Sequence, residues 1–350
     1  MNFRSDNEAP VAPEIMEALA RANSGTDHSY GADAATARLQ GQFSELFETE
    51  VAVFPVITGT AANALSLAQS APPYGAIYCH RDSHIHVDEC NAPEFYTGGA
   101  KLHALDGAHG RIDLAALEAA LAATGFHGDH EPEPAAISLT QATEAGAVYA
   151  IDDIAALAEA AHGRGLRVHM DGARIANAVA RLGRAPADMT WRAGIDILSF
   201  GATKNGAMAA EAVVVFRRDL VDGLARRRMR GGHLLSKMRF VSAQLEAYIA
   251  DGLWLTLAAR ANRAASRLAD GLSAIAGVTL LHPVEGNELF ARLPAAALDG
   301  VTGDGFEFHR WPGAESTVRF VCSYAARDGD IDALIASLRR HCGAAADINP

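Results

Sequence analysis

Short apolar runs alternate with stretches of helical periodicity from about residue 35 to residue 220. Runs of this length, bounded by small and polar residues, are typical of buried strands. Residues 113–123 and 152–162 are predicted helices that open with an aspartate suited to capping. The predicted strands are residues 51–56, 76–79, 135–139, 167–170, 195–200 and 211–216. This alternation predicts an α/β fold with a mostly parallel sheet wrapped by helices.

The pattern changes after Gly232, where a long helix is predicted to run to residue 275. It is followed by short strands and a last helix over residues 331–341. The strand candidates are residues 278–281, 288–293, 306–310 and 317–324. A chain of 350 residues suits two domains. We expect an N-terminal arm and a large cofactor-binding domain over residues 1–251, and a smaller C-terminal α+β domain over residues 252–350.

Charge and composition exclude several classes of protein. The formal net charge of −12 argues against a general nucleic-acid binder, because such proteins neutralise phosphates with Lys and Arg. The basic run 226–230 is too short to change this. Residues 1–8 contain no apolar signal core, and no stretch is apolar for long enough to form a membrane helix. The cysteines are few and not spaced as pairs: Cys79, Cys90, Cys322 and Cys342. We therefore expect a cytoplasmic protein with reduced thiols that binds neither nucleic acid nor membrane.

Two predicted strands end in side chains that together indicate a cofactor site. Strand 195–200 leads Lys204 into a turn of small residues, and strand 167–170 ends in Asp171. Each residue has an ordinary alternative, as a solvated surface lysine or a helix-capping aspartate. Ligands of open α/β sheets, however, bind beyond the carboxyl ends of parallel strands, where both residues lie. Pyridoxal 5′-phosphate requires a lysine that holds its aldehyde as a Schiff base and an acid that keeps its ring nitrogen protonated. The pair predicts a site for this cofactor.

The run 58–63, Thr-Gly-Thr-Ala-Ala-Asn, lies between a predicted strand and a predicted helix. Small residues, a hydroxyl and free N–H groups at the start of a helix favour a phosphate. Taken alone, the run is more typical of an ordinary capped helix. Beside Lys204 and Asp171, it predicts that Gly59 and Thr60 bind the phosphate of the cofactor.

The densest group of potential metal ligands is the run 79–90, with histidine, cysteine and carboxylate side chains. These are suitable zinc ligands, but no recognised spacing such as HExxH is present. A histidine stacked on the cofactor ring accounts for one of them without a metal. We therefore expect no metal, and we expect the other side chains of the run to be solvated loop residues.

Motifs spread along the whole chain carry a resemblance to a known family. They are Arg4-Ser5-Asp6, Tyr30-Gly31, Gly59-Thr60, His84 with Glu89, Asp171-Gly172-Ala173-Arg174, Thr203-Lys204 and Val318-Arg319-Phe320-Val321. In these motifs the chain resembles the low-specificity L-threonine aldolases of the threonine aldolase and β-eliminating lyase family. The resemblance implies an aspartate-aminotransferase-like fold of type I, with a large mostly parallel sheet domain and a smaller C-terminal α+β domain.

The resemblance also implies roles for individual residues. Lys204 would form the Schiff base, Asp171 would pair with the pyridine nitrogen, and His84 would stack on the ring. The other residues implied in cofactor binding are Gly59, Thr60, Arg174, Thr203 and, from a neighbouring subunit, Arg239, which matches better than Arg228. The residues implied in substrate binding are Ser5, Arg174, Arg319, Glu144 and, from a neighbouring subunit, Tyr30. A bidentate arginine suits a substrate carboxylate, although an arginine in a strand is otherwise usually a surface ion-pair partner.

The implied reaction is the retro-aldol cleavage of L-threonine, L-allo-threonine and related L-β-hydroxy-α-amino acids to glycine and an aldehyde. His84 is the candidate base for the β-hydroxyl group. Glu144 stands where many members of the family carry a second active-site histidine, and it is the alternative base. Dimers of the family share active sites and commonly pair, so we expect a homotetramer.

Four other functions remain open from the sequence. A β-eliminating lyase or a transaminase would use the same cofactor. A metal-dependent hydrolase would use the run 79–90. A non-catalytic binding protein could have kept the fold.

Overall fold

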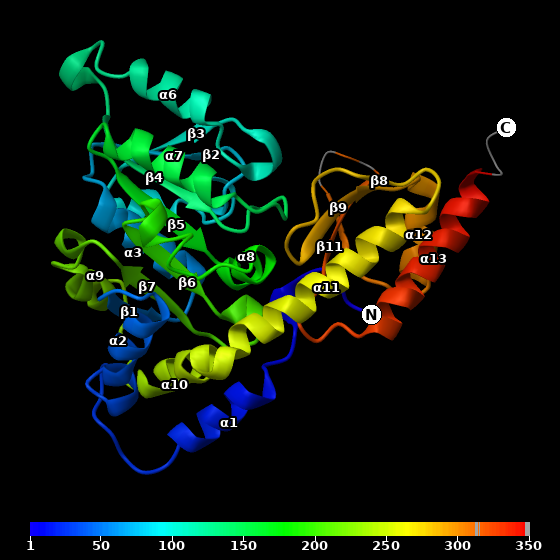
Figure 1. The fold of residues 1–350 in the computed structure, drawn as a ribbon, viewed down its shortest axis with the longest axis horizontal. Coiled ribbons are helices and arrows are strands. Elements are labelled where there is room, and N and C mark those ends of the chain that lie inside the picture. Colours follow the sequence, from blue (N-terminus) through cyan, green and yellow to red (C-terminus); the bar gives the residue numbers. More distant parts are fainter. Residues whose placement is uncertain (312–313, 315, 347–350) are drawn as a thin grey trace.

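The computed structural model describes residues 1–311, 314 and 316–346, and shows two sheets joined by a long helix (Figure 1). Residues 312–313, 315 and 347–350, which belong to the predicted small domain, lie outside the described residues. The strands are β1 (Ala52–Val56), β2 (Gly75–His80), β3 (Lys101–Leu105), β4 (Glu133–Thr140), β5 (Arg167–Gly172), β6 (Ile197–Gly201), β7 (Glu211–Val215), β8 (Thr279–Leu280), β9 (Glu288–Arg292), β10 (His309–Arg310) and β11 (Thr317–Val321).

Helices make up much of the rest of the chain. They are α1 (Pro13–Ala22), α2 (Ala34–Leu46), α3 (Gly59–Ser70), α4 (His84–Val87), α5 (Ala92–Thr97), α6 (Leu114–Ala122), α7 (Ile151–His162), α8 (Ile175–Leu182), α9 (Leu224–Arg230), α10 (Arg239–Ile249), α11 (Leu253–Ser273), α12 (Ala295–Gly303) and α13 (Asp328–Ala346). Two short 3-10 turns matter below, η1 (Asp6–Glu8) and η5 (Thr203–Asn205). Within the described part of the chain, none of these helices combines the length and the apolar character that a membrane crossing requires.

The large sheet has the strand order β1-β7-β6-β5-β4-β2-β3. Its neighbouring strands are parallel except at β7, which runs antiparallel to both β1 and β6. Strands β2, β6 and β7 are buried along their whole length, as expected for strands covered by helices on both faces. Helices α3, α7 and α8 pack against the central strands. The prediction of a mostly parallel sheet wrapped by helices is confirmed.

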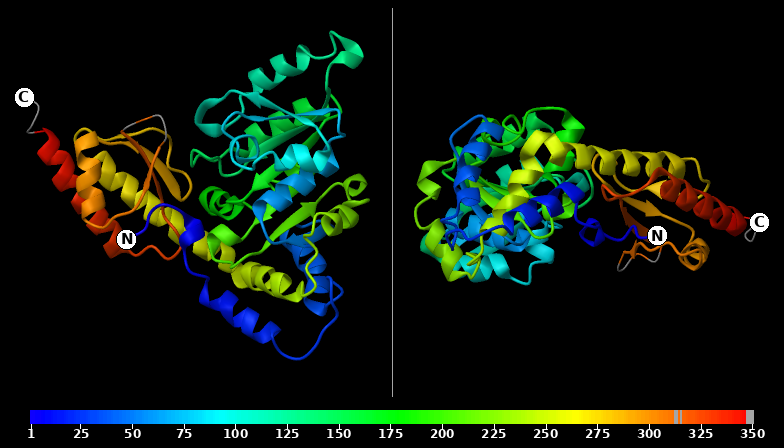
Figure 2. Two further views of the ribbon diagram at one scale, coloured as in Figure 1. Left: turned by 180° about the vertical axis from the view of Figure 1, so that it is seen from behind. Right: turned by 90° about the horizontal axis from the view of Figure 1, so that it is seen from below.

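The small sheet has the order β10-β11-β9-β8, and all its pairs are antiparallel. Helix α11 contacts both α8 beside the large sheet and α13 beside the small one, and it runs between the two parts in every view (Figure 1, Figure 2). The N-terminal arm joins the small sheet, because Phe3 is buried in its core and bonds to the backbone of Glu307 and Val321. The domain boundary at residue 251 stays a prediction.

Three elements differ from the sequence expectations. The edge strand β3 was not predicted, because its Lys-Leu-His-Ala-Leu sequence is largely exposed and contains no apolar run. The long helix after Gly232 is broken at residues 250–252, where Asp251 and Gly252 have positive φ angles of 51° and 69°. In the predicted strand 306–310, only the last two residues form a strand.

An aromatic cluster around Phe200 fixes β6 to the helices beneath it. The ring of Phe200 lies 5.1 Å from that of Phe43, 5.7 Å from that of Trp254 and 6.1 Å from that of Tyr248. The Asn205 amide then donates to the Tyr248 hydroxyl at 2.7 Å and to the Trp254 carbonyl at 2.8 Å. The cluster thereby anchors η5, the turn that carries the predicted cofactor lysine.

The carboxyl ends of β4, β5 and β6 lie side by side. Thr140 pairs in register with Asp171, and Gly172 pairs with Phe200. The chain leaves β6 so close to the segment after β5 that a Cβ at Gly201 would lie 2.5 Å from the Ala173 carbonyl oxygen. Glycine is therefore required at the end of β6.

Phe200→Ala is expected to lower the free energy of unfolding by about 3–5 kcal/mol, because it leaves a cavity inside the aromatic cluster. Urea unfolding followed by circular dichroism measures this loss. Phe126→Ala is the matched control, since Phe126 is 85% exposed and its removal should change stability by less than about 0.5 kcal/mol. Equal losses in the two variants would contradict the anchoring role of the cluster.

Candidate active site

Two adjoining cavities lie at the carboxyl ends of the central strands. The inner cavity, of about 270 Å³, contains Lys204 and Asp171. The outer cavity, of about 580 Å³, extends toward the small sheet. The other predicted site residues that line the inner cavity are Gly59, Thr60, His84, Glu144, Arg174 and Thr203. Ser5 and Arg319 line the outer cavity, and His84, Glu144, Arg174 and Lys204 line both. The structure thus brings together most of the residues that the sequence singled out.

A buried carboxylate binds the backbone of the turn that carries Lys204. Glu211, the first residue of β7, accepts hydrogen bonds from the backbone N–H groups of Ala202 at 3.0 Å and Thr203 at 3.4 Å. Burial raises the pKa of Glu211 to about 7. Glu211 itself lines the inner cavity. Sequence reasoning missed this residue, although a glutamate at the start of the apolar strand 211–216 was a signal.

Asp171 is fixed by two neutral donors. Its Oδ1 accepts from the Ala173 N–H at 3.0 Å, and its Oδ2 accepts from the Asn63 side-chain amide at 2.8 Å. The same amide nitrogen donates to Glu89 Oε1 at 2.8 Å. Sequence reasoning also missed Asn63, which is buried in the small-residue helix α3. One buried amide therefore connects the carboxylate of Asp171 with that of Glu89.

Glu89 in turn orients His84. The Nδ1 of His84 lies 2.8 Å from Glu89 Oε1, and because a carboxylate only accepts, Nδ1 carries the proton. The hydrogen bond to Glu89 raises the pKa of His84. We call His84, Glu89, Asn63 and Asp171 the polar chain. It links the predicted stacking histidine to the predicted partner of the pyridine nitrogen.

The rest of the run 79–90 departs from the sequence expectation. Cys79, His80 and Glu89 are buried, whereas solvated loop residues were expected. His80 bonds to the Gly107 carbonyl at 3.1 Å, and Cys79 lies within β2. His80 is buried because β2 extends one residue beyond the apolar run 76–79 that predicted it, and Glu89 is buried as a member of the polar chain. Among the described residues, no three His, Cys, Asp or Glu side chains are grouped as they would be around a metal ion.

The N-terminus of α3 faces the inner cavity. Thr58 caps this helix by accepting from the Ala61 N–H at 3.1 Å. The first N–H groups of a helix have no partner within it and attract anions. A Cβ added at Gly59 would meet no atom within 4 Å, so the space above the helix start is open. Residues and space therefore fit the phosphate of a cofactor that Lys204 and Asp171 would hold at its other end.

Arg174 is the centre of a buried cluster of charges. Its Nε and Nη2 donate to Asp6 at 2.8 and 3.1 Å, and its Nη1 lies 3.3 Å from Glu288 Oε1. Burial opposes the charge of Arg174, but the two carboxylates outweigh it and raise the pKa of the guanidinium. Arg319 lies nearby on β11, with its guanidinium over the Trp311 ring and a donor to the Arg4 carbonyl at 3.4 Å. No role was predicted for Glu288.

Glu144 lies at the junction of the two cavities. Its Oε1 accepts from the His84 N–H at 2.8 Å and from the Thr140 hydroxyl at 2.9 Å. Its Oε2 is shielded from solvent and has no hydrogen-bond partner within the described chain. Burial, followed by the nearby charge of Asp171, raises the pKa of Glu144 to about 7. One oxygen of this carboxylate is thus available to a ligand.

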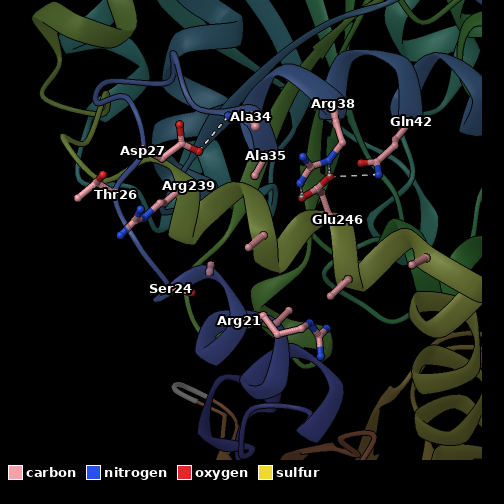
Figure 3. Close-up of a pocket in the computed structure, with 15 residues that line it drawn as sticks. Arg21, Ser24, Thr26, Asp27, Ala34, Ala35, Arg38, Gln42, Arg239 and Glu246 are labelled. Carbon is pink, nitrogen blue, oxygen red and sulfur yellow. Dashed lines mark hydrogen bonds and ion pairs between the residues drawn. The ribbon is translucent and has the colours of Figure 1, made fainter.

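Two predicted site residues lie away from both cavities. Tyr30 is 54% exposed, and Arg239 approaches the Gly25 carbonyl at 3.4 Å. Arg239 lines a separate groove of about 510 Å³ between α1, α2 and α10, where Arg38 pairs with Glu246 (Figure 3). Arg228 is buried and donates to the Pro55 carbonyl at 3.2 Å. Within one chain, none of these three side chains reaches the cavities, so their role in a neighbouring subunit's site stays a prediction.

Glu89→Gln is expected to lower the pKa of His84, because it removes the charged acceptor that stabilises the imidazolium. Titration of the imidazole C–H signals by NMR measures this pKa. Asp88→Asn is the matched control, since Asp88 is exposed and lies 3.8 Å from His84 Nε2. The polar chain would be contradicted if the control shifted the pKa of His84 as much as Glu89→Gln does.

Comparison with known proteins agrees with this geometry. The sequence matches the Beta-eliminating lyase family over residues 2–296. The low specificity L-threonine aldolase of a Pseudomonas species is 40% identical over 338 residues, which is 96% of each chain. The low specificity L-threonine aldolase of Pseudomonas aeruginosa is 41% identical over 331 residues, which is 94% of each chain.

Solved structures show the same fold. A threonine aldolase of Leishmania major matches with a TM-score of 0.90 at 25% identity, covering 97% of this chain and 98% of that one. An aspartate aminotransferase of Rhodobacter sphaeroides matches in fold alone, with a TM-score of 0.70 at 16% identity over 99% of this chain and 93% of that one. The predicted fold of type I is confirmed. The match over most of the sequence shows that the chain belongs to the beta-eliminating lyase family.

Proposed function

We propose that the chain catalyses the pyridoxal phosphate-dependent retro-aldol cleavage of L-threonine, L-allo-threonine and related L-β-hydroxy-α-amino acids to glycine and an aldehyde. The observation that carries this proposal is the placement of Lys204 and Asp171 in one cavity, with Arg174 at its junction with a second. The two Pseudomonas relatives, which bear the name of this activity, support it.

The inner cavity offers partners for each part of the cofactor. Lys204 would hold the aldehyde carbon, Asp171 the ring nitrogen and His84 the ring face, while Gly59 and Thr60 would bind the phosphate through the start of α3. Thr203 lies beside the lysine. When bound, pyridoxal phosphate supplies a sink for the electrons released by the breaking Cα–Cβ bond.

The outer cavity offers partners for the substrate. Arg174 and Arg319, with Ser5, would hold its α-carboxylate, because a planar guanidinium binds a carboxylate through paired hydrogen bonds. The apolar side chains of Phe290 and Trp311 line the same cavity and would face the β-substituent. Fixing the carboxylate turns the Cα–Cβ bond to the orientation in which it breaks.

We assign the transfer of the β-hydroxyl proton to Glu144, with His84 as the alternative. His84 is committed through Nδ1 to Glu89, so only its Nε2 could take up a proton. The Oε2 of Glu144 has no hydrogen-bond partner among the described residues, and its carboxyl group has a pKa of about 7. A group with a pKa near the operating pH transfers protons efficiently.

A β-eliminating lyase or a transaminase would use the same cofactor site. Incubation with the four threonine stereoisomers and with phenylserine separates these reactions. Glycine with an aldehyde supports the proposal, whereas pyruvate with ammonia, or a keto acid, contradicts it. A homotetramer whose dimers share active sites through Tyr30 and Arg239, and a cytoplasmic location, stay predictions from the resemblance.

Lys204→Ala is expected to abolish turnover and the near-visible absorbance of the bound cofactor. The chain has only three lysines, Lys101, Lys204 and Lys237, so borohydride reduction followed by peptide mass spectrometry can locate the attachment directly. Lys101→Ala is the control, because Lys101 is exposed on β3 and should keep both activity and absorbance. A cofactor adduct on Lys237 in the Lys204→Ala variant would disprove the assignment.

Glu144→Gln is expected to lower kcat by roughly 10²- to 10⁴-fold, which is the usual contribution of an acid–base group. In the unaltered enzyme, kcat should rise as the pH rises through about 7, because a base acts in its deprotonated form. The variant should lose this limb of the pH profile and change its ratio of L-threonine to L-allo-threonine cleavage. Glu118→Gln, on the exposed face of α6, is the control. If kcat still rises with pH through about 7 in Glu144→Gln, the transfer of the β-hydroxyl proton is assigned to His84 instead.

A further inference from the structure

Glu288 is a buried carboxylate that the proposed reaction does not use. It is the first residue of β9, its side chain is 1% exposed, and it lines the outer cavity. Neither of its oxygens has a hydrogen-bond partner within the described chain. Its Oε1 lies 3.3 Å from Arg174 Nη1. Since a buried carboxylate without hydrogen bonds is costly, this position requires an explanation.

Glu288 competes for the nitrogen that a substrate needs. The Nε and Nη2 of Arg174 already donate to Asp6, so Nη1 is the guanidinium nitrogen least committed within the chain. Glu288 lies against that nitrogen. A substrate carboxylate that binds Arg174 must therefore share it with Glu288 or displace it.

The charges around the carboxylate subsite decide whether Glu288 is protonated or ionised when substrate is bound. With the substrate bound, three carboxylates would surround the guanidinium groups of Arg174 and Arg319. These carboxylates belong to Asp6, Glu288 and the substrate. An uncompensated buried charge is strongly unfavourable. Protonation of Glu288 leaves two negative charges against two positive ones, and the neutral acid can donate a hydrogen bond to the substrate carboxylate.

Other charged and titratable groups face the same space from neighbouring elements. They are Asp6 on η1, Asp82 before α4, His84 on α4, Asp88 after α4, Glu144 after β4, Arg174 before α8, Lys204 on η5, His282 after β8 and Arg319 on β11. Burial raises the pKa of Glu288, and the two arginines and Lys204 oppose this rise while Asp6 adds to it. A substrate anion adds a further negative charge, which raises this pKa again.

We propose that Glu288 takes up a proton when an α-carboxylate binds between Arg174 and Arg319, so that the affinity for the carboxylate falls as the pH rises. Glu288 is then a positioning residue that sets the charge of the carboxylate subsite. This inference rests on the substrate placement given under the proposed function.

The test uses the cofactor-loaded enzyme and 3-hydroxybutanoate. This probe has the carboxylate and the β-hydroxyl group of threonine but no amine, so it cannot react with the cofactor. Calorimetry in buffers of different ionisation enthalpy counts the protons taken up on binding, and titration from pH 6 to pH 9 gives the pH dependence of Kd. The absorbance of the cofactor, recorded in parallel, reports any change in protonation at Lys204.

We expect the unaltered enzyme to take up as much as one proton per site, with Kd rising by up to about tenfold per pH unit above the pKa of free Glu288. In Glu288→Gln and Glu288→Met, uptake at this group should vanish and Kd should depend much less on pH. Glu285→Gln is the matched control, because Glu285 lies three residues earlier, outside both cavities, and bonds to the Val148 N–H. It should keep the proton uptake.

Three outcomes would overturn the proposal. They are equal uptake with and without Glu288, loss of uptake in Glu144→Gln instead, or no binding of 3-hydroxybutanoate at any pH. Circular dichroism checks that each variant is folded, and the measurements on the unaltered enzyme stand without any variant. The binding assay is also independent of catalysis. A protein that releases no aldehyde from threonine yet shows this proton uptake would refute the proposed function and keep the inference.

Discussion

The candidate active site depends on holding the buried carboxylate of Asp171, which forms no ion pair with any of the described residues. Two neutral donors do this, the Ala173 N–H and the Asn63 amide. Because Asn63 lies on α3, the same helix that presents its N-terminus to the inner cavity also fixes the carboxylate of Asp171. One helix therefore sets the spacing between the proposed phosphate end and the proposed ring end of the site. Hydrogen bonds offset the cost of burying the charge, and a protonated ring nitrogen would pair with it under the proposed function.

Several of the predicted site residues that line the inner cavity share one property, which is that they stand at the end of a predicted strand or just after it. Lys204, Asp171 and Gly59 come just after apolar runs, and parallel strands place such positions at one edge of a sheet. The fold class followed from the same runs. The break between α10 and α11 did not, because it requires a positive φ at Asp251 that periodicity does not reveal.

The missed residues are polar side chains buried by tertiary contacts. Glu288 and Glu211 each open a strand, where an exposed glutamate is ordinary, and only the packing of β9 and β7 shows that they face the cavities. Asp6 pairs with Arg174, which lies far along the chain, so its role could not be inferred from the neighbouring sequence. Together these carboxylates give the site more acidic groups than cations. Burial is the main cause of the pKa values of about 7 at Glu144 and Glu211, and at Glu144 the charge of Asp171 adds to it.

The scarcity of lysine has a chemical consequence for an enzyme that releases aldehydes. Free aldehydes condense with unprotonated primary amines, whereas the guanidinium of arginine stays protonated and reacts poorly. Only three of the thirty basic side chains are lysines, and Lys101 and Lys237 are the exposed ones. A product escaping from the cavity therefore meets a surface whose positive charge is carried almost entirely by unreactive groups. Few side-chain amines are therefore available to be lost to the product besides the one at Lys204.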